Sequence, residues 1–127
     1  MPEYDRLHFV PPAPVAAVVL RNPANEATTA EATLLTDTGA DVSLLPRSEI
    51  EQPGIRPLPD RLYELAGFDG SKSLAQVVML DVLFLRRAFR GQYLLTDEER
   101  GVLGRDVLNN LSLVLDGPQQ RWSERSP

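Results

Sequence analysis

The sequence predicts an all-β domain that carries one short helix. Short apolar runs rich in β-branched residues recur about every ten residues, and Asn, Pro, Gly or Asp bounds each of them. Every second residue from Val78 to Phe84 is apolar, whereas Asp81 lies on the opposite face, which is the period of two typical of a strand. Only residues 105–110 have a helical pattern. Many strands with a single short helix indicate the all-β class.

The first two strands lead to one acidic turn. Residues 15–22 are rich in valine and form the first half of a hairpin, because the "NPAN" that ends them favours a turn. The returning run at 26–36 is rich in threonine and leads directly into Asp37. We therefore expect Asp37 at the end of a strand.

The remaining elements alternate strands with turns. A strand at 42–45 is followed by a helical or 3₁₀ turn that begins at Pro46 and stops at Pro53-Gly54. Two strand-like runs within 62–85 are separated by "GFDGS", as they are at a hairpin tip. Further strands are expected at 88–95, just before Gly104, at 111–115 and around Trp122.

Length and composition limit the possible functions. The 127 residues suit one domain spanning 1–127, with an N-terminal extension at 1–13 and a hairpin or tail at 116–127. No cysteine is present, which excludes disulfides, thiolate metal sites and cysteine nucleophiles. The net charge is −5 and the basic residues are scattered, so we expect neither nucleic acid nor a membrane surface as a partner.

The first twenty residues do not resemble a targeting segment. They contain acidic residues where a secretory signal needs positive charge, and Pro11, Pro12 and Pro14 interrupt their apolar stretch. No apolar run reaches the roughly 20 residues that span a bilayer. We therefore expect a soluble, cytoplasmic protein. Lys72 is the only lysine among 13 basic residues, which favours a GC-rich, bacterial genome.

The stretch "LLTDTGADVSLLP" places two aspartates and a glycine between apolar runs. A calcium loop of the EF-hand kind requires an acid or amide at its third place and a glutamate at its twelfth, but Gly39 and Ser48 stand there. A serine hydrolase built on Ser43 or Ser48 needs a histidine base, and the single histidine, His8, lies near the start of the chain. A purely structural turn remains open, in which Asp37 accepts backbone N–H groups and Gly39 adopts a positive φ.

Three motifs together resemble those of the retroviral-type (retropepsin-like) aspartic protease family. "LLTDTGADVSLLP", "GFDGS" and "VLGRDVL" occur in that family's order and near its spacing, and the similarity covers residues 15–115. The resemblance implies a closed or partly open acid-protease-type β-barrel with one lobe per chain and one short C-terminal helix. Each subunit of that family contributes one D-T-G or D-S-G, and this chain has one copy. A working enzyme is therefore expected to be a homodimer that cleaves a peptide or protein substrate.

The resemblance also implies roles for the residues of the turn. Asp37 of each subunit would activate a water held between the two carboxylates, with no metal or cofactor. The Thr38 hydroxyl would bond across the twofold axis, and Gly39 would allow the backbone close to the pair. Asp41 and Arg105 would form a charged link between the turn and the helix, supported by Gly104.

The "GFDGS" hairpin would correspond to the flap that closes over bound peptide. An ordinary hairpin tip is the other interpretation of this segment. The residues expected to contact substrate are Ala40, Asp41, Leu65, Ala66, Gly67, Phe68, Asp69 and Gly70.

The chain departs from the family at two places. Thr36 precedes Asp37 where the viral enzymes usually have an aliphatic residue. The sequence after Leu115 is longer than the family's minimal form, and "DGPQQRWSE" is expected to form a terminal hairpin in which Trp122 is a packing or dimer anchor. A second function therefore stays open: a retropepsin-like domain that binds peptides or oligomerises without hydrolysis.

Overall fold

A computed structural model describes residues 2–67 and 69–125 of the chain. The strands are β1 (Val15–Arg21), β2 (Ala32–Thr36), β3 (Leu44–Pro46), β4 (Leu62–Ala66), β5 (Lys72–Phe84), β6 (Arg87–Thr96), β7 (Gly101–Leu103), β8 (Leu113–Asp116) and β9 (Arg121–Glu124). A 3₁₀ turn, η1 (Arg47–Glu49), follows β3, and one short helix, α1 (Arg105–Leu108), follows β7. The all-β class with one short helix is confirmed. No helix among the described residues is long and apolar enough to cross a membrane.

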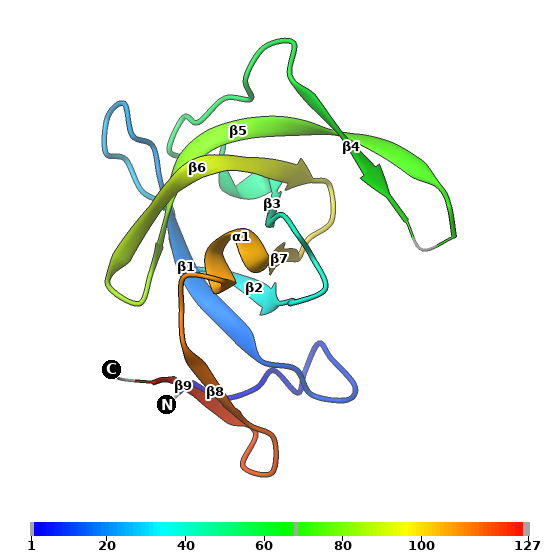
Figure 1. Ribbon diagram of the computed structural model, residues 1–127. Coiled ribbons are helices and arrows are strands. Elements are labelled where there is room, and N and C mark those ends of the chain that lie inside the picture. The colour runs from blue at the N-terminus through cyan, green and yellow to red at the C-terminus, as the bar shows by residue number, and fades with distance from the viewer. Residues whose placement is uncertain (1, 68, 126–127) are drawn as a thin grey trace.

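Six strands close into a barrel because β1 changes its partner halfway along. Residues 15–18 of β1 pair with β2, whereas residues 19–21 pair with β5. The ring runs β1-β2-β7-β3-β6-β5 and returns to β1, and β4 extends it as an outer strand on β5 (Figure 1). The barrel predicted from the family resemblance is therefore confirmed.

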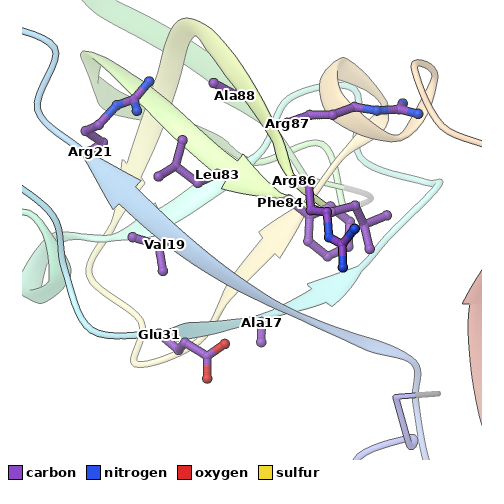
Figure 2. Close-up of a pocket in the computed structure, with 10 residues that line it drawn as sticks. Ala17, Val19, Arg21, Glu31, Leu83, Phe84, Arg86, Arg87 and Ala88 are labelled. Atoms are coloured by element: carbon purple, nitrogen blue, oxygen red, sulfur yellow. The ribbon is translucent and has the colours of Figure 1, made fainter. Parts of the chain in front are cut away.

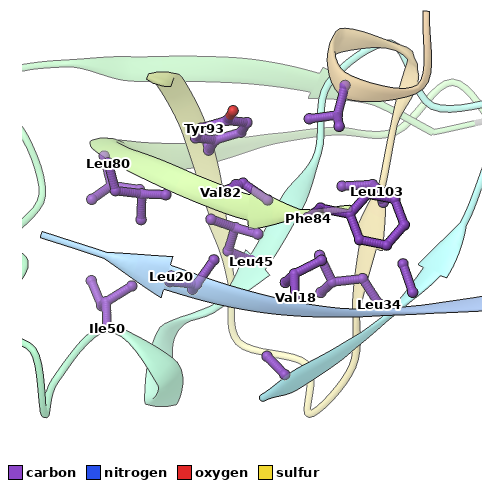
Figure 3. Close-up of a cluster of buried hydrophobic side chains, with 14 of the residues drawn as sticks. Val18, Leu20, Leu34, Leu45, Ile50, Leu80, Val82, Phe84, Tyr93 and Leu103 are labelled. Carbon is purple, nitrogen blue, oxygen red and sulfur yellow. The ribbon is translucent and has the colours of Figure 1, made fainter. Parts of the chain in front are cut away.

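The barrel is filled by aliphatic side chains that alternate along the strands. Leu80 and Val82 of β5 are fully buried, as the period of two predicted. Phe84, at the end of this row, lies 5.7 Å from the ring of Trp122, which is 2% exposed and is therefore a packing residue. Other core residues, all labelled in Figure 3, are Val18, Leu20, Leu34, Leu45, Ile50, Tyr93 and Leu103.

Asp81 was expected on the polar face of β5, yet its side chain is completely buried. The sheet register explains how the carboxylate is satisfied, because Arg21 of β1 and Arg90 of β6 are its partners on the two neighbouring strands. Arg21 Nη2 lies 2.9 Å from one carboxylate oxygen and Arg90 Nε 2.8 Å from the other. The hydrogen bond from Arg90 lowers the pKa of Asp81, burial opposes it, and Arg21 adds to the lowering. Asp81 is therefore an ionised link across three strands.

Two hairpins lie outside the ring. β4 and the first half of β5 form an arm that projects from the barrel (Figure 1), and Gly67 and residues 69–71 lie at its tip. β8 and β9 form the expected terminal hairpin, which is attached to the barrel by Trp122, since Trp122 Nε1 donates to the Val15 carbonyl at 2.8 Å.

Some elements are shorter than the sequence predicted. β2 begins at Ala32 rather than at residue 26. Glu26 has a positive φ of 61°, which a strand does not allow, and the Thr29 side chain bonds to β1 because its Oγ1 accepts the Leu20 N–H at 3.0 Å. Similarly, α1 ends at Leu108 and turns occupy the two residues after it.

Candidate active site

Parallel pairing places the aspartate turn beside the helix. β2 and β7 run parallel with Thr36 opposite Leu103, so both strands end at the same end of the barrel. Asp37 N–H donates to the Leu103 carbonyl at 2.9 Å, which extends the pairing by one residue into the turn. The D-T-G turn and the Gly-Arg-Asp segment, far apart in sequence, are therefore neighbours, as the motifs predicted.

The Asp37 carboxylate is oriented from within its own turn. Its Oδ1 accepts the Gly39 N–H at 2.9 Å, and the Asp37 carbonyl accepts the Ala40 N–H at 3.2 Å. Asp37 is half-buried, whereas Thr38 and Gly39 are exposed. The turn therefore presents a half-buried carboxylate with one oxygen held by the backbone, and such a group can exchange protons with a bound molecule.

The purely structural interpretation of the turn expected Gly39 to adopt a positive φ. Its φ is not positive. A Cβ at this position would lie 3.1 Å from Asp37 Oδ1, closer than most side chains tolerate. The absent side chain therefore leaves room for the carboxylate, and the Gly39 N–H is the group that holds it.

The charged link between Asp41 and Arg105 is not formed in the described chain. Asp41 is exposed, and no ion pair joins it to Arg105. Arg105 Nη1 instead donates to the Thr38 carbonyl at 2.6 Å, and Arg105 N–H donates to the Ala40 carbonyl at 2.8 Å. Arg105 thus stabilises the turn by donating to the backbone carbonyls of the turn rather than to the Asp41 carboxylate.

A second pair, missed by the sequence analysis, joins the two segments. The Asp106 carboxylate accepts the Ser43 N–H at 3.0 Å and the Ser43 hydroxyl at 2.6 Å. The Ser43 Oγ in turn accepts the Gly104 N–H at 2.9 Å. The only sequence signal for this pair was the acid that follows Arg105 and a polar residue inside an apolar run.

Gly104 allows this close approach. A Cβ on Gly104 would lie 2.8 Å from the Ala40 carbonyl oxygen and 2.9 Å from the Val42 carbonyl carbon. Both are backbone atoms, so they have little freedom to move away. The absence of a side chain at Gly104 therefore lets the start of α1 lie against the backbone of residues 40–43.

Thr36 and Thr38 flank an apolar cavity of about 270 Å³. The Thr36 hydroxyl donates to the Pro14 carbonyl at 2.8 Å, so this departure from the family pattern ties the strand end to the segment before β1. The other residues that line the cavity are Pro14, Leu108, Leu111, Leu113 and Leu115. The turn is thus continuous with an apolar surface of the terminal hairpin.

The arm and the segment after the turn share one small hydrophobic cluster. Leu65 of the arm and Val42 and Leu44, which follow the turn, all pack against the buried residues Ala75, Val77 and Leu94. At the tip, Gly70 has a φ of 82°, and a Cβ on Gly67 would lie 2.7 Å from the Ser71 hydroxyl, so both glycines suit this hairpin. Of the other residues expected to bind substrate, Ala66 and Asp69 are exposed, Ala40 is half-buried, and Phe68 lies outside the described residues.

A separate pocket of about 370 Å³ lies away from the turn, between β1 and the β5–β6 hairpin (Figure 2). Arginines stand at its rim, but two of them already have partners: Arg21 contacts Asp81, and Arg87 contacts Glu124. No residue of the predicted site lines this pocket. Within the described ranges, no group of acidic or histidine side chains could hold a metal ion.

The chain has the fold of the retroviral aspartic proteases, and the retropepsin-like fold predicted from the motifs is confirmed. A solved structure of this class is the EIAV protease complexed with the inhibitor HBY-793. It matches 84% of this chain and 91% of its own, with a TM-score of 0.57 and 23% identical residues. No model of a protein family matches the sequence, and no curated protein does. At this level of identity the likeness is one of fold.

Proposed function

We propose that the chain is one subunit of a homodimeric aspartic endopeptidase that hydrolyses extended peptides. The observation that carries this proposal is the bracing of the Asp37 turn. One carboxylate oxygen is held by Gly39, and the backbone after it is held by Arg105, a residue 67 positions beyond Thr38. In the described chain the other oxygen, Oδ2, accepts no hydrogen bond from protein. A turn that merely reversed the chain would not require this bracing around an accessible carboxylate.

A second copy is needed by the chemistry. Hydrolysis of a peptide by carboxylates alone requires one group that accepts a proton from water and one that donates a proton to the carbonyl oxygen. The chain holds one D-T-G, so a symmetric dimer is the simplest arrangement that supplies both groups. Two carboxylates close together cannot both ionise cheaply, so the pair retains one proton.

The proposed reaction balances without a cofactor. The ionised carboxylate takes a proton from water as the water oxygen bonds to the scissile carbonyl carbon, and the protonated carboxyl of the partner gives its proton to the carbonyl oxygen. The tetrahedral diol then collapses: one hydroxyl returns its proton to a carboxylate, the other carboxyl protonates the amide nitrogen, and the C–N bond breaks. A carboxylic acid and an amine leave, and the pair again holds one proton.

The arm is the proposed flap. Leu62, Tyr63 and Leu74 are large apolar residues that the arm exposes, at 61%, 41% and 67%. An extended peptide could pair with such a hairpin through its backbone while its side chains contact apolar residues. We therefore assign the arm to substrate binding, with a preference for apolar residues near the cleaved bond.

Cleavage of a diverse peptide library, read by mass spectrometry between about pH 4 and 8, tests the proposal. The wild type is compared at high concentration with Asp37→Asn and with Asp60→Asn, a matched change at an exposed aspartate outside the site. New peptide ends are expected from the wild type and Asp60→Asn alone. If Asp37→Asn cleaves equally well, the catalytic assignment is wrong. If none of the three cleaves although all dimerise, the non-catalytic binding module is the better description.

A further inference from the structure

The strand pairing of the barrel has a gap beside one residue of β1. Thr36 N–H donates to the Pro14 carbonyl at 3.1 Å, which fixes the phase of the ladder between β1 and β2. In an antiparallel pair the residues alternate between bonding to the partner and turning away from it. Residues 15, 17 and 19 of β1 therefore direct their N–H and C=O groups away from β2, toward the end of the β5–β6 hairpin.

Ala17 is the residue at this gap. The backbone groups on both sides of it are used: the Val15 carbonyl accepts Trp122 Nε1–H at 2.8 Å, and Val19 pairs with Leu83 of β5. The pairing with β5 stops there, and among the described residues no backbone hydrogen bond joins Ala17 to the hairpin. The N–H and C=O of Ala17 therefore face the space between β1 and the β5–β6 turn, where they are open to a ligand.

Two pockets meet at Ala17 on the outer face of β1. The pocket of about 370 Å³ in Figure 2 and a second pocket of about 310 Å³ share Ala17, Phe84 and Leu85 in their walls. The side chains of Val19 and Leu83 add further apolar surface. We call the two pockets together the β1 groove. No residue of the aspartate turn, 37–41, lines either pocket, so the groove is separate from the candidate active site.

The turn in the wall of the groove has an unusual sequence for its backbone. Leu85 and Arg86 are the two residues between the paired ends of β5 and β6, and their φ angles are 52° and 62°. A two-residue hairpin turn with two positive φ angles favours Asn and Gly, because other side chains are strained there. Both side chains line the groove. The chain thus retains an unfavourable pair of residues at the position where their side chains meet the groove.

Arg86 gives one side of the groove an uncompensated positive charge. The other two arginines in its wall have acidic partners, Asp81 and Glu124, whereas no carboxylate among the described residues forms an ion pair with Arg86. The acids of the groove lie elsewhere: Glu31 precedes β2, across β1 from the hairpin, and Glu3 belongs to the N-terminal segment beside β9. A ligand carboxylate is therefore favoured on the hairpin side of the groove.

We propose that the β1 groove binds an extended peptide segment of a partner protein in which an acidic residue has apolar neighbours. One residue of the peptide pairs with the N–H and C=O of Ala17, as a peptide does at an open strand edge. The ligand carboxylate binds the Arg86 guanidinium, and the apolar side chains cover Val19, Leu83 and Leu85. The inference does not rest on the proposed peptidase, because binding here uses no residue of the aspartate turn.

Fluorescence anisotropy tests the site with a labelled peptide that contains Leu-Glu-Leu and a second peptide of equal length that contains Leu-Gln-Leu. The Asp37→Asn chain is used so that neither peptide is cleaved. The glutamate peptide should bind at least about tenfold more tightly, because its carboxylate pairs with the Arg86 guanidinium. Arg86→Gln should remove this preference, whereas Arg100→Gln, at an exposed arginine outside the groove, should keep it. The absence of a preference, or a preference that survives Arg86→Gln, would overturn the inference.

Arg86→Gly separates binding from folding. Glycine adopts a positive φ without strain, so this variant should unfold at a temperature no lower than its parent and yet lose its preference for the glutamate peptide. Thermal unfolding and anisotropy on the same samples measure both quantities. An Arg86→Gly chain that binds the glutamate peptide as tightly as its parent would overturn the site.

Backbone amide NMR locates the bound peptide. Adding the glutamate peptide should shift the amide signals of Ala17 and Leu85 and leave that of Gly39 in place. Shifts at Gly39 alone would place the peptide in the candidate active site, and displacement by free glutamate as effective as by unlabelled peptide would reduce the groove to a carboxylate site. Either result overturns the inference. Peptide cleavage by the wild type is measured separately, so failure of the groove and failure of the proposed protease remain distinguishable.

Discussion

Ser43 and Asp106 are 63 residues apart in sequence and share two hydrogen bonds, at 3.0 and 2.6 Å. Ser43 is fully buried, whereas the helix that carries Asp106 lies at the surface. The pair therefore joins the segment that follows the aspartate turn to the segment that follows β7. Since Asp106 also accepts its own helix's Val107 N–H at 3.0 Å, one carboxylate fastens the strand and the start of the helix together.

Replacing Ser43 should loosen this link. In Ser43→Ala, the exposed Asp106 carboxylate loses a hydrogen bond and the buried Gly104 N–H loses its acceptor, so we expect a loss of about 1–3 kcal/mol in the free energy of unfolding. Urea denaturation measures it. Ser48→Ala, an exposed serine, is the control and should be neutral. Equal stability of the two variants would show that the link contributes nothing.

Gly101 should tolerate no side chain. A Cβ there would lie 2.1 Å from the Leu44 carbonyl oxygen, inside the contact between β3 and β7. Gly101→Ala must push these strands apart, and we expect it to cost at least about 2 kcal/mol of unfolding free energy. Gly117→Ala has nothing within 4 Å and serves as the control. Thermal unfolding compares them, and a fully stable Gly101→Ala would contradict the close approach.

Removing the buried charge at residue 81 should destabilise the barrel. Asp81→Asn leaves Arg21 and Arg90 facing a neutral amide; because these arginines are 31% and 62% exposed and can be rehydrated, the expected loss is about 1–3 kcal/mol of unfolding free energy. Asp97→Asn breaks an ion pair with Arg47 in which Asp97 is 87% exposed, so no measurable change is expected.

The same pair of variants has a pH signature. Because the pKa of Asp81 is lowered in the folded state, its contribution is complete above the unfolded pKa of about 3.9 and is lost as the pH falls through the folded pKa. Wild-type stability should therefore decline in acid, and Asp81→Asn should flatten that decline. A parallel decline in both proteins would place the acid sensitivity elsewhere.

Peptide cleavage should follow a bell-shaped pH profile with an acidic to near-neutral optimum. The proposed carboxylate pair works only while it holds a single proton, so activity falls when the pair gains a second proton or loses the first. Initial rates across pH, at a concentration that keeps the dimer intact, measure this profile. A rate that stays flat into alkaline pH is the contrary result.

Dilution should reduce the specific activity. If the site forms only when two chains meet, activity per chain falls as the concentration drops below the dissociation constant of the dimer, and the folded monomer remains. Progress curves at serial dilutions, alongside ultracentrifugation, measure both quantities. A dimer that persists at nanomolar concentration would show that weak dimerisation does not limit the activity.

The sequence predicted the strands, the turn and the neighbouring helix because each has a local cause. The alternation in β5 marks its buried face, and turn-forming residues bound most of the hairpins. The proximity of Asp37 to Gly104 also followed, but from three motifs taken together rather than from local chemistry.

What the sequence did not predict depends on register between distant strands. The burial of Asp81 follows from the partners that β1 and β6 place beside it, and the period of two alone assigned it to the polar face. The same limit applies to Arg105. Its guanidinium could bind either the Asp41 carboxylate or the Thr38 carbonyl, because both groups belong to the same turn and lie close together in the sequence. The geometry of the turn selects the Thr38 carbonyl.

The parallel contact between β2 and β7 also determines when the aspartate turn can become ordered during synthesis of the chain. During synthesis the aspartate turn leaves the ribosome long before Leu103 and Asp106, its supports, have been made. Until the last fifth of the chain emerges, the turn has no strand to lie against and no helix to brace it. A nascent or truncated chain would therefore carry Asp37 without the strand and helix that orient its turn, and the supported turn would form only after the barrel had closed.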